Sequence, residues 1–207
     1  MEANAELDDN GGTVTCQFRE VHPDGTKKHN NASCIVRYES KANWVQEWSR
    51  YGHMVQNSIK MLHDKALTGS AHRMQSGLAY KVFESFVTYG DKYRSMDEVV
   101  FDGLEGTATV SLKTSIGDYT GPYHLDGLCH VSGFLCNASD LDSEDSVYIS
   151  EGWSSARVLN LDLLTSTQPG ATLTNYVRMQ NRPKQLLEGD IYILLDGEVV
   201  SVWEGVK

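Results

Sequence analysis

The stretch that decides the fold is GPYHLDGLCHVSGFLCN, residues 121–137. It opens with Pro122 and then carries apolar side chains at the three- and four-residue steps of a helix. These side chains are Leu125, Leu128, Cys129, Phe134 and Leu135. A helix this apolar belongs in a protein core, so we predict that these residues form the central helix of the fold.

The segments around this helix have the patterns of another helix and of several strands. Before it, residues 78–90 have helical spacing, and two strand-like segments follow, EVVF and TATVSLK. After it come five more strand-like segments, which are SVYISEGW, ARVLNL, ATLTNYVRMQ, GDIYILLDG and EVVSVWEGV. We therefore predict an α+β hot-dog fold over residues 78–207, in which a curled antiparallel sheet wraps the central apolar helix.

The first part of the chain has a different organisation. Residues 1–12 are polar and acidic, and we predict a disordered tail there. Two alternating segments, TVTCQFR and ASCIVRY, flank turn-forming residues and predict a β-hairpin. From Asn43, apolar residues recur at helical steps to about His63, which predicts an amphipathic helix. The hairpin and this helix make up a second predicted region, residues 13–77.

Composition and charge limit the class of protein. The chain has 207 residues, 40% of them hydrophobic and 22% charged, which is typical of a globular protein. Its 18 basic and 28 acidic residues give a net charge of −10, which disfavours nucleic acid as a partner. No stretch approaches the ~20 apolar residues of a membrane-spanning helix. The N-terminus also lacks the basic and apolar regions of a secretory signal, so we expect a cytoplasmic location.

Four cysteines stand at positions 16, 34, 129 and 136, and no two of them form a CxxC pair. This spacing argues against a zinc ribbon and a CxxC redox motif. Cys16 and Cys34 fall on the two hairpin strands and are expected to lie near each other. Cys129 and Cys136 are two helical turns apart and are expected to face one core, so we predict buried free thiols. Since the chain also lacks a glycine-rich phosphate loop, no cofactor is expected.

The central helix carries the candidates for acid–base chemistry. A carboxylic acid in an apolar setting can hold a proton at neutral pH and deliver it, and Asp126 lies between two leucines. His130 follows one turn later, so it points the same way and can orient Asp126 or exchange protons with it. His124 is two positions from Asp126 and would face elsewhere, unless the helix begins only at Leu125.

Structural roles are open for the same residues. Asp126 can cap the N-terminus of the central helix, where backbone N–H groups need acceptors. His130 can be a core histidine whose nitrogens are satisfied by hydrogen bonds. A metal site would need further ligands, and we find none at a convincing spacing, so no metal is expected.

The segment YHLDGLCHVSGF resembles the Asp-bearing helix in the second hot-dog of polyketide synthase dehydratase and product-template domains, whose pattern is D-x-x-x-(H/Q). Further segments resemble fungal product-template domains in the same order, so the likeness covers nearly the whole chain after residue 12. They are NWVQEW, AHRMQSGLAYKVFESFVTYGDKYRSMDEVV, SVYISEGWSSARVL, TLTNYVRMQ and GDIYILLDGEVVSVWEGVK. Product-template domains of non-reducing fungal synthases guide the aldol cyclisation and aromatisation of poly-β-ketone chains.

This resemblance implies a polyketide cyclase or dehydratase-like enzyme of fungal secondary metabolism. The enzyme would act on a poly-β-ketone or a polyketide-derived intermediate by acid–base catalysis, through aldol cyclisation, dehydration or isomerisation. Asp126 would be the acid–base residue and His130 its helper. Four further residues match positions near the family's pocket and are expected to line the substrate site: Tyr123, Trp153, Arg157 and Asn137.

One feature of the family is absent. Its catalytic histidine lies in the first hot-dog within H-x-x-x-G-x-x-x-x-P, and none of the seven histidines here has this setting. The chain therefore resembles a free-standing relative that lacks most of the first hot-dog and keeps its last hairpin and a linker helix. Either His124 or His130 would replace the missing histidine, or another hot-dog chain would supply it. We expect a homodimer, or pairing with another hot-dog chain or a synthase, because an open sheet edge invites a partner strand.

An alternative function comes from a different class. The chain would then be a catalytically inactive module that binds a polyketide or docks onto a synthase. The absent histidine motif favours this hypothesis, whereas the retained Asp126 and His130 in an apolar helix favour the enzyme.

Overall fold

The structure is a computed structural model that describes residues 2–8, 11–38, 40–111, 113, 121–138, 147–160, 162, 172–183 and 186–207. The chain divides into two compact units, Met1–Gln46 and Glu47–Lys207. Each unit is described by itself. The predicted boundary between residues 77 and 78 differs from this division, because the amphipathic helix from Glu47 onward belongs to the second unit.

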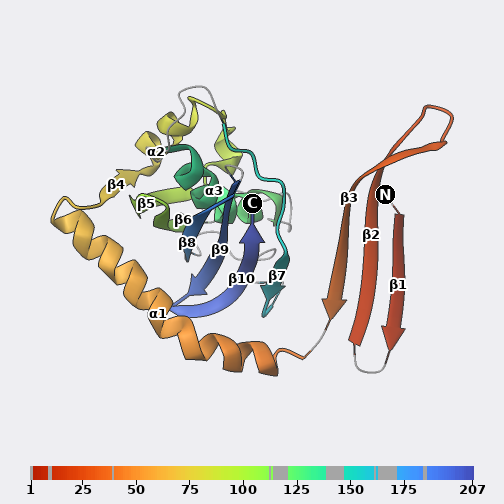
Figure 1. Ribbon diagram of the computed structural model, residues 1–207, viewed down its shortest axis with the longest axis horizontal. Helices are drawn as coiled ribbons and strands as arrows, with labels where there is room; N and C mark the ends of the chain where they lie inside the picture. The colour runs from red at the N-terminus through yellow and green to blue at the C-terminus, as the bar shows by residue number, and fades with distance from the viewer. Residues whose placement is uncertain are drawn as a thin grey trace. The chain divides into compact units, whose positions relative to one another are not determined.

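The first unit is a three-stranded antiparallel sheet in the order β1-β2-β3 (Figure 1). Its strands are β1 (Glu2–Asp8), β2 (Gly11–Val21) and β3 (Lys27–Tyr38). The predicted hairpin is therefore present as β2 and β3, joined by a turn in which the His22 N–H donates to the Thr26 carbonyl. The predicted tail over residues 1–12 is wrong for residues 2–8, because these pair with β2 as a third strand.

The sheet of the first unit has one apolar face. Side chains on a strand alternate between the two faces, so directly opposite residues share a face. The pairs Val14–Val36 and Cys16–Cys34 lie in this way on one face, whereas Thr13 and Arg37 lie opposite each other on the other face.

The second unit is a seven-stranded antiparallel sheet with helices against it. The strand order is β4-β5-β6-β8-β9-β10-β7. The strands are β4 (His72–Gln75), β5 (Met96–Asp102), β6 (Glu105–Ser111), β7 (Ser155–Val158), β8 (Thr172–Arg182), β9 (Leu186–Leu195) and β10 (Glu198–Val206). The helical elements are α1 (Ala42–Leu67), which begins in the first unit, α2 (Ser76–Phe83), the short η1 (Asp91–Tyr93) and α3 (Gly121–Ala138).

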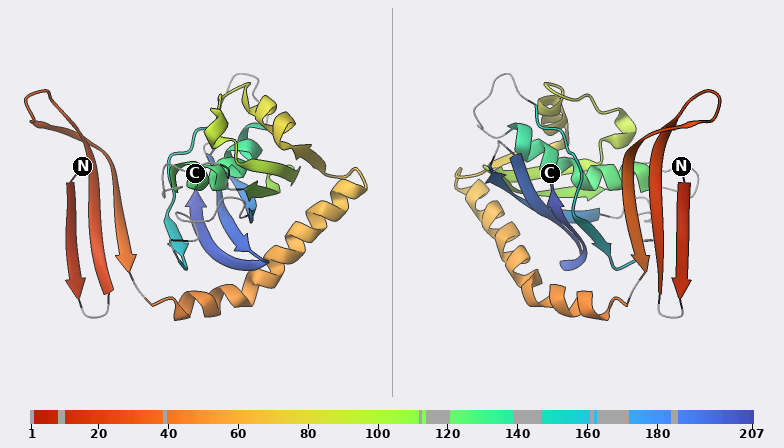
Figure 2. Two further views of the ribbon diagram at one scale, coloured as in Figure 1. Left: turned by 180° about the vertical axis from the view of Figure 1, so that it is seen from behind. Right: turned by 45° about the vertical axis from the view of Figure 1, so that its right-hand side comes forward.

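Helices α3 and α1 cover opposite faces of this sheet, as can be followed in Figures 1 and 2. Ile191 and Ile193 of β9 are fully buried in the core with the apolar side chains of α3. Tyr192, between them, faces the other side, where its ring meets Tyr51 of α1 at 5.9 Å. The predicted fold is confirmed, since the apolar helix over residues 121–137 is the element that the sheet wraps.

A buried asparagine fixes α3 to the sheet. Asn175 of β8 is 0% exposed, and its side-chain nitrogen donates to the Leu128 carbonyl of α3 at 2.8 Å. Its side-chain oxygen accepts the Ala108 N–H of β6 at 3.0 Å. One amide therefore links the helix to two strands, and every bond is shielded from water.

Two predicted elements differ from the structure, and one strand was not predicted. The helix predicted over residues 78–90 ends at Phe83. Residues 147–153 of the predicted strand SVYISEGW are not a strand, because the Asn137 side chain binds both the N–H and the carbonyl of Tyr148. Strand β4 has no counterpart among the predicted elements and forms by pairing with β5.

Two glycines of α3 are expected to respond in opposite ways to alanine. A Cβ on Gly127 would lie 1.7 Å from the Ser95 hydroxyl oxygen, whereas a Cβ on Gly133 would meet nothing within 4 Å. We expect Gly127→Ala to destabilise the fold by about 1–3 kcal/mol through overpacking. We expect Gly133→Ala to stabilise it by about 0.5–1 kcal/mol through helix propensity. Urea unfolding of both variants measures this, and equal effects would contradict the close approach of Ser95 to α3.

Candidate active site

Asp126 lies on the face of α3 that points away from the sheet. It stands two positions from His124 and five from Val131, both of which are buried, and such spacings place it on the opposite side of the helix. Its side chain is 43% exposed. The apolar enclosure expected around this carboxylate is therefore incomplete, and one side of it is open to a reacting molecule.

The buried side chain of His130 contacts the Asp126 carboxylate. Its side chain is only 2% exposed, and its Nε2 lies 2.7 Å from Asp126 Oδ2. Tyr89 packs against the imidazole with ring centroids 4.1 Å apart, and Phe83 lies at 5.8 Å. The prediction that Asp126 and His130 share a helix face is thus confirmed by direct contact.

Tyr80 of α2 completes a chain of three side chains. Its hydroxyl lies 2.9 Å from His130 Nδ1 and accepts the Met96 N–H at 3.0 Å. Burial raises the pKa of Tyr80, so the hydroxyl keeps its proton and can donate it. The Tyr80 hydroxyl has two acceptors within reach, His130 Nδ1 at 2.9 Å and the Tyr93 carbonyl at 3.4 Å, and the shorter contact is the one to Nδ1. With Tyr80 donating to Nδ1, the Nε2–H of His130 faces the carboxylate.

This network leaves one carboxylate oxygen available. Asp126 Oδ2 accepts from His130, whereas none of the described residues hydrogen-bonds Oδ1. Both imidazole nitrogens of His130 are engaged, one with Tyr80 and one with Asp126. The arrangement therefore orients a carboxylate and offers Oδ1 for proton exchange, while His130 holds it in place.

The structure does not bring His124 to Asp126. Helix α3 begins at Gly121, so His124 lies within it and faces the sheet, fully buried. Neither of its ring nitrogens has a hydrogen-bond partner among the described residues. Burial lowers the pKa of His124 to about 4, so the ring is neutral at pH 7.

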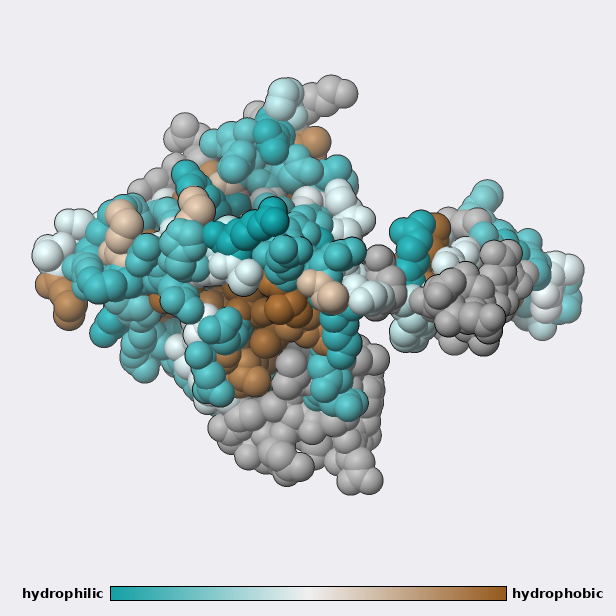
Figure 3. Space-filling model, turned by 90° about the horizontal axis from the view of Figure 1, so that it is seen from below, coloured by the Kyte–Doolittle hydropathy of each residue, from teal (hydrophilic) through white to brown (hydrophobic). Residues whose placement is uncertain are grey.

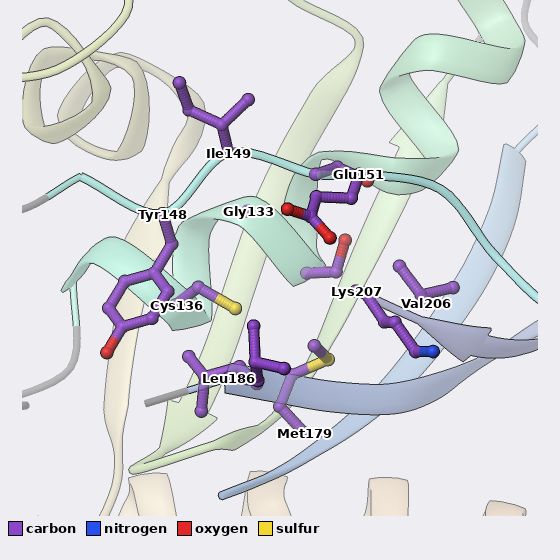
Figure 4. A pocket seen from close by; sticks show the side chains of 12 residues that line it. Gly133, Cys136, Tyr148, Ile149, Glu151, Met179, Leu186, Val206 and Lys207 are labelled. Atoms are coloured by element: carbon purple, nitrogen blue, oxygen red, sulfur yellow. The ribbon is translucent and has the colours of Figure 1, made fainter. Parts of the chain in front are cut away.

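A pocket with an empty volume of about 520 Å³ lies toward the C-terminal end of α3 (Figure 4). Figure 4 shows α3 on one side of it, the segment with Tyr148 and Ile149 above, and the strand ends with Met179 and Val206 opposite. Its lining is mainly apolar, with Glu151 and Lys207 as the charged members. Figure 3 shows one face of the second unit, where apolar side chains gather in a patch framed by hydrophilic ones.

Asn137 shapes a wall of this pocket. Its nitrogen donates to the Gly133 carbonyl at 2.9 Å and to the Tyr148 carbonyl at 3.1 Å, and its oxygen accepts the Tyr148 N–H at 2.8 Å. Gly133 lies on the same face of α3 as Asp126, about 10 Å further along the axis. Asn137 was predicted to line the substrate site, and the structure places it as the support of a lining segment.

The other three predicted lining residues lie in separate surroundings. The Tyr123 ring meets Tyr93 at 4.8 Å. Trp153 is more than half exposed and packs on Trp203 at 5.1 Å. Arg157 pairs with Glu47 and Glu204, each at 2.9 Å, and its guanidinium lies over the Trp48 ring. The charge of Arg157 is therefore already matched by two carboxylates.

Tyr80 is the site residue that sequence reasoning missed. It lies 50 positions before His130 and on another helix, so spacing along the chain gives no sign of the contact. Its own segment, LAYKVF, has the pattern of a core helix, and Tyr80 is indeed almost fully buried. Only packing of α2 against α3 shows that its hydroxyl points at the imidazole.

The described part of the chain has neither a cluster of metal ligands nor a helix suited to cross a membrane. Among these residues, no three histidine, cysteine or acidic side chains gather as metal ligands would. Within the same ranges, no helix combines the length and the apolar character that crossing a membrane requires.

Comparison with known proteins relates the sequence of this chain to fungal polyketide synthases. The chain is 48% identical over 213 residues to a non-reducing polyketide synthase, PKS1, of Zymoseptoria tritici. It is 43% identical over 214 residues to the non-reducing polyketide synthase Preu8 of Preussia isomera. The chain is related to a segment of fungal non-reducing polyketide synthases. Each match covers the whole chain but about 10% of the synthase, and no family model matches the sequence.

Solved structures show the same fold at low sequence identity. The dehydratase domain of RzxB from Pseudomonas fluorescens superposes with a TM-score of 0.63 at 13% identity, over 99% of this chain and 66% of that one. The dehydratase domain from the CurK module of curacin polyketide synthase gives 0.60 at 15% identity, over 97% and 63%. The chain thus has the hot-dog fold of these dehydratase domains, and its sequence is similar to a segment of fungal non-reducing polyketide synthases.

We expect Tyr80→Phe to destabilise the second unit by about 1–3 kcal/mol, because it leaves the Met96 N–H and His130 Nδ1 buried without partners. Tyr93→Phe is the matched control, since no described residue hydrogen-bonds the Tyr93 hydroxyl. Urea unfolding of both variants measures the difference, and ¹⁵N spectra of His130 report the protonated nitrogen. Equal stability of the two variants would show that the Tyr80 hydroxyl does not hold the network together.

Acid is expected to destabilise the protein partly through His124. The folded state holds this ring neutral, with a pKa of about 4, whereas the unfolded chain protonates it near pH 6.5. Its contribution is therefore complete above pH 6.5 and is lost as the pH falls toward 4, by about 2–3 kcal/mol. Urea unfolding at pH 7 and pH 4.5 should show a smaller loss for His124→Phe than for wild type. The exposed His53→Gln serves as control, and parallel losses in all three proteins would refute the assignment.

Proposed function

We propose that the chain is an acid–base domain that acts on a poly-β-ketone or polyketide-derived intermediate, by aldol cyclisation, dehydration or isomerisation. The observation that carries this proposal is the half-exposed Asp126 carboxylate, held by His130 and Tyr80. Relationship to non-reducing polyketide synthases supports the substrate class. The chain spans about a tenth of the length of those synthases. A polyketide substrate is therefore proposed for this chain by its relationship to them.

Asp126 would exchange the proton at Oδ1. As a carboxylate it can accept the acidic proton that lies between two carbonyl groups, and as an acid it can protonate a departing hydroxyl. Oδ2 stays bound to the His130 Nε2–H in both states, so the carboxyl group keeps its orientation during the transfer. The Asp126 carboxyl group can therefore catalyse either ring closure or loss of water, depending on the substrate.

We assign His130 the role of a positioning residue. A base needs a free lone pair toward the substrate, and both nitrogens of His130 already hydrogen-bond within the protein. His124 is buried on the sheet side of α3. A second base for the reaction would therefore come from outside the described residues, either from a second copy, another hot-dog chain or the rest of a synthase.

The pocket near Gly133 and Cys136 would hold the apolar part of the substrate. It opens along the same helix that carries Asp126 and is lined mainly by apolar side chains. Burial of carbon chain there would place the reacting carbonyl groups toward Asp126.

We expect Asp126→Asn to abolish any change that wild type makes to the products of a non-reducing synthase whose own product-template segment has been inactivated. Loss of a positioned acid–base group lowers the rate by about 100-fold or more. The product profile is measured by liquid chromatography and mass spectrometry with no added chain, wild type, Asp126→Asn and the control Asp91→Asn. Asp91 is an exposed carboxylate of η1 outside the site.

Two results would contradict the proposal that the chain is an enzyme. If wild type and Asp126→Asn redirect products equally, Asp126 is not the acid–base group. If none of the proteins changes the profile but all bind an aromatic polyketide, as followed by tryptophan fluorescence, the chain is a binding module instead.

A further inference from the structure

Cys16 and Cys34 lie directly opposite each other on β2 and β3 of the first unit. The pairing is regular on both sides of them, with Thr15 opposite Ile35 and Gln17 opposite Ser33. Opposite residues of an antiparallel pair have Cα atoms about 4.5 or 5.5 Å apart, according to the hydrogen-bond position. A disulfide spans Cα separations of about 4.4–6.8 Å, so either position accommodates one.

The two thiols also meet. Burial, the charge of the neighbouring Cys16 and a thiol–thiol hydrogen bond raise the pKa of Cys34. Because directly opposite residues of an antiparallel pair project to the same face, both thiols lie on the apolar face of the sheet. Both cysteines are free thiols in the structure, so this is a reduced pair in the register of a disulfide.

Access to solvent distinguishes Cys34 from the other three cysteines. Cys34 is exposed, Cys16 and Cys129 are half-buried, and Cys136 is buried. Cys129 and Cys136 lie on α3, where burial raises the pKa of each to about 12. Thiolate is the reactive form, so the two helix cysteines are poor nucleophiles at neutral pH. The prediction of buried free thiols is therefore wrong for Cys34, which is exposed, whereas Cys16 and Cys129 are half-buried and Cys136 is buried.

We propose that Cys16 and Cys34 are a site of reversible disulfide formation by exchange with a small disulfide of the glutathione class. The exposed Cys34 loses its proton and attacks one sulfur of oxidised glutathione, which breaks that S–S bond and releases one reduced glutathione. Cys16 then loses its proton and attacks the Cys34 sulfur, releasing the second. Two protein thiols are oxidised, and one glutathione disulfide is reduced to two thiols.

A disulfide between Cys16 and Cys34 would restrict opening of the β2–β3 hairpin. It joins two strands whose register is otherwise held by backbone hydrogen bonds and by side-chain pairing. Closing the loop around the His22–Thr26 turn removes open conformations of the hairpin, so opening becomes rarer. Oxidation therefore rigidifies β2 and β3.

The test uses the wild-type chain in reduced form and after incubation with oxidised glutathione. Intact mass should fall by two hydrogen atoms, and peptide mapping should show Cys16 joined to Cys34. Hydrogen exchange of the β2 and β3 amides should slow by about tenfold or more, and dithiothreitol should reverse it. Cys16→Ser and Cys34→Ser should each take up one glutathione instead, whereas Cys129→Ser should behave as wild type.

Three results would overturn the proposal. They are a wild-type chain that stops at one bound glutathione, a bridge that joins two chains, and a bridge that includes Cys129 or Cys136. Unchanged exchange in a chain with the Cys16–Cys34 bond would refute its effect on the hairpin.

Discussion

Burial of one face of α3 against the curled sheet is the constraint on which the second unit depends. The sheet can wrap this helix because the described core side chains on its inner side are mainly apolar, and the buried Asn175 among them hydrogen-bonds both Leu128 and Ala108. With one face of α3 held in this way, the opposite face has a fixed direction. Asp126 and His130 lie on that face or at its edge, so core packing sets where the candidate chemistry is presented.

The same packing explains why the candidate site is asymmetric. His130 is enclosed by aromatic rings from α2 and the segment after it, whereas Asp126 keeps nearly half of its side chain open. A buried imidazole between two hydrogen-bond partners cannot turn, and it holds one carboxylate oxygen in place. The other oxygen stays available, so a rigid inner group supports a reactive outer one. This division of roles follows from burial of the two side chains.

The two units are stabilised by different interactions. The second unit encloses a core, and its helix and strands are held from several directions. The first unit is a sheet with an apolar face, and its stability depends on strand pairing. A thiol pair that faces across two of its strands is therefore placed where one covalent bond would reinforce the strand pairing.

The sequence by itself determined the central helix, the hairpin of β2 and β3, most later strands and the pairing of Asp126 with His130. Each of these depends on periodicity or on spacing within one element, and such patterns are local. Tyr80, strands β1 and β4, the turn inward of His124 and the irregular segment at Tyr148 were decided only by the tertiary structure. Each depends on contacts between residues far apart in the chain, and no spacing along a sequence records which element packs against which.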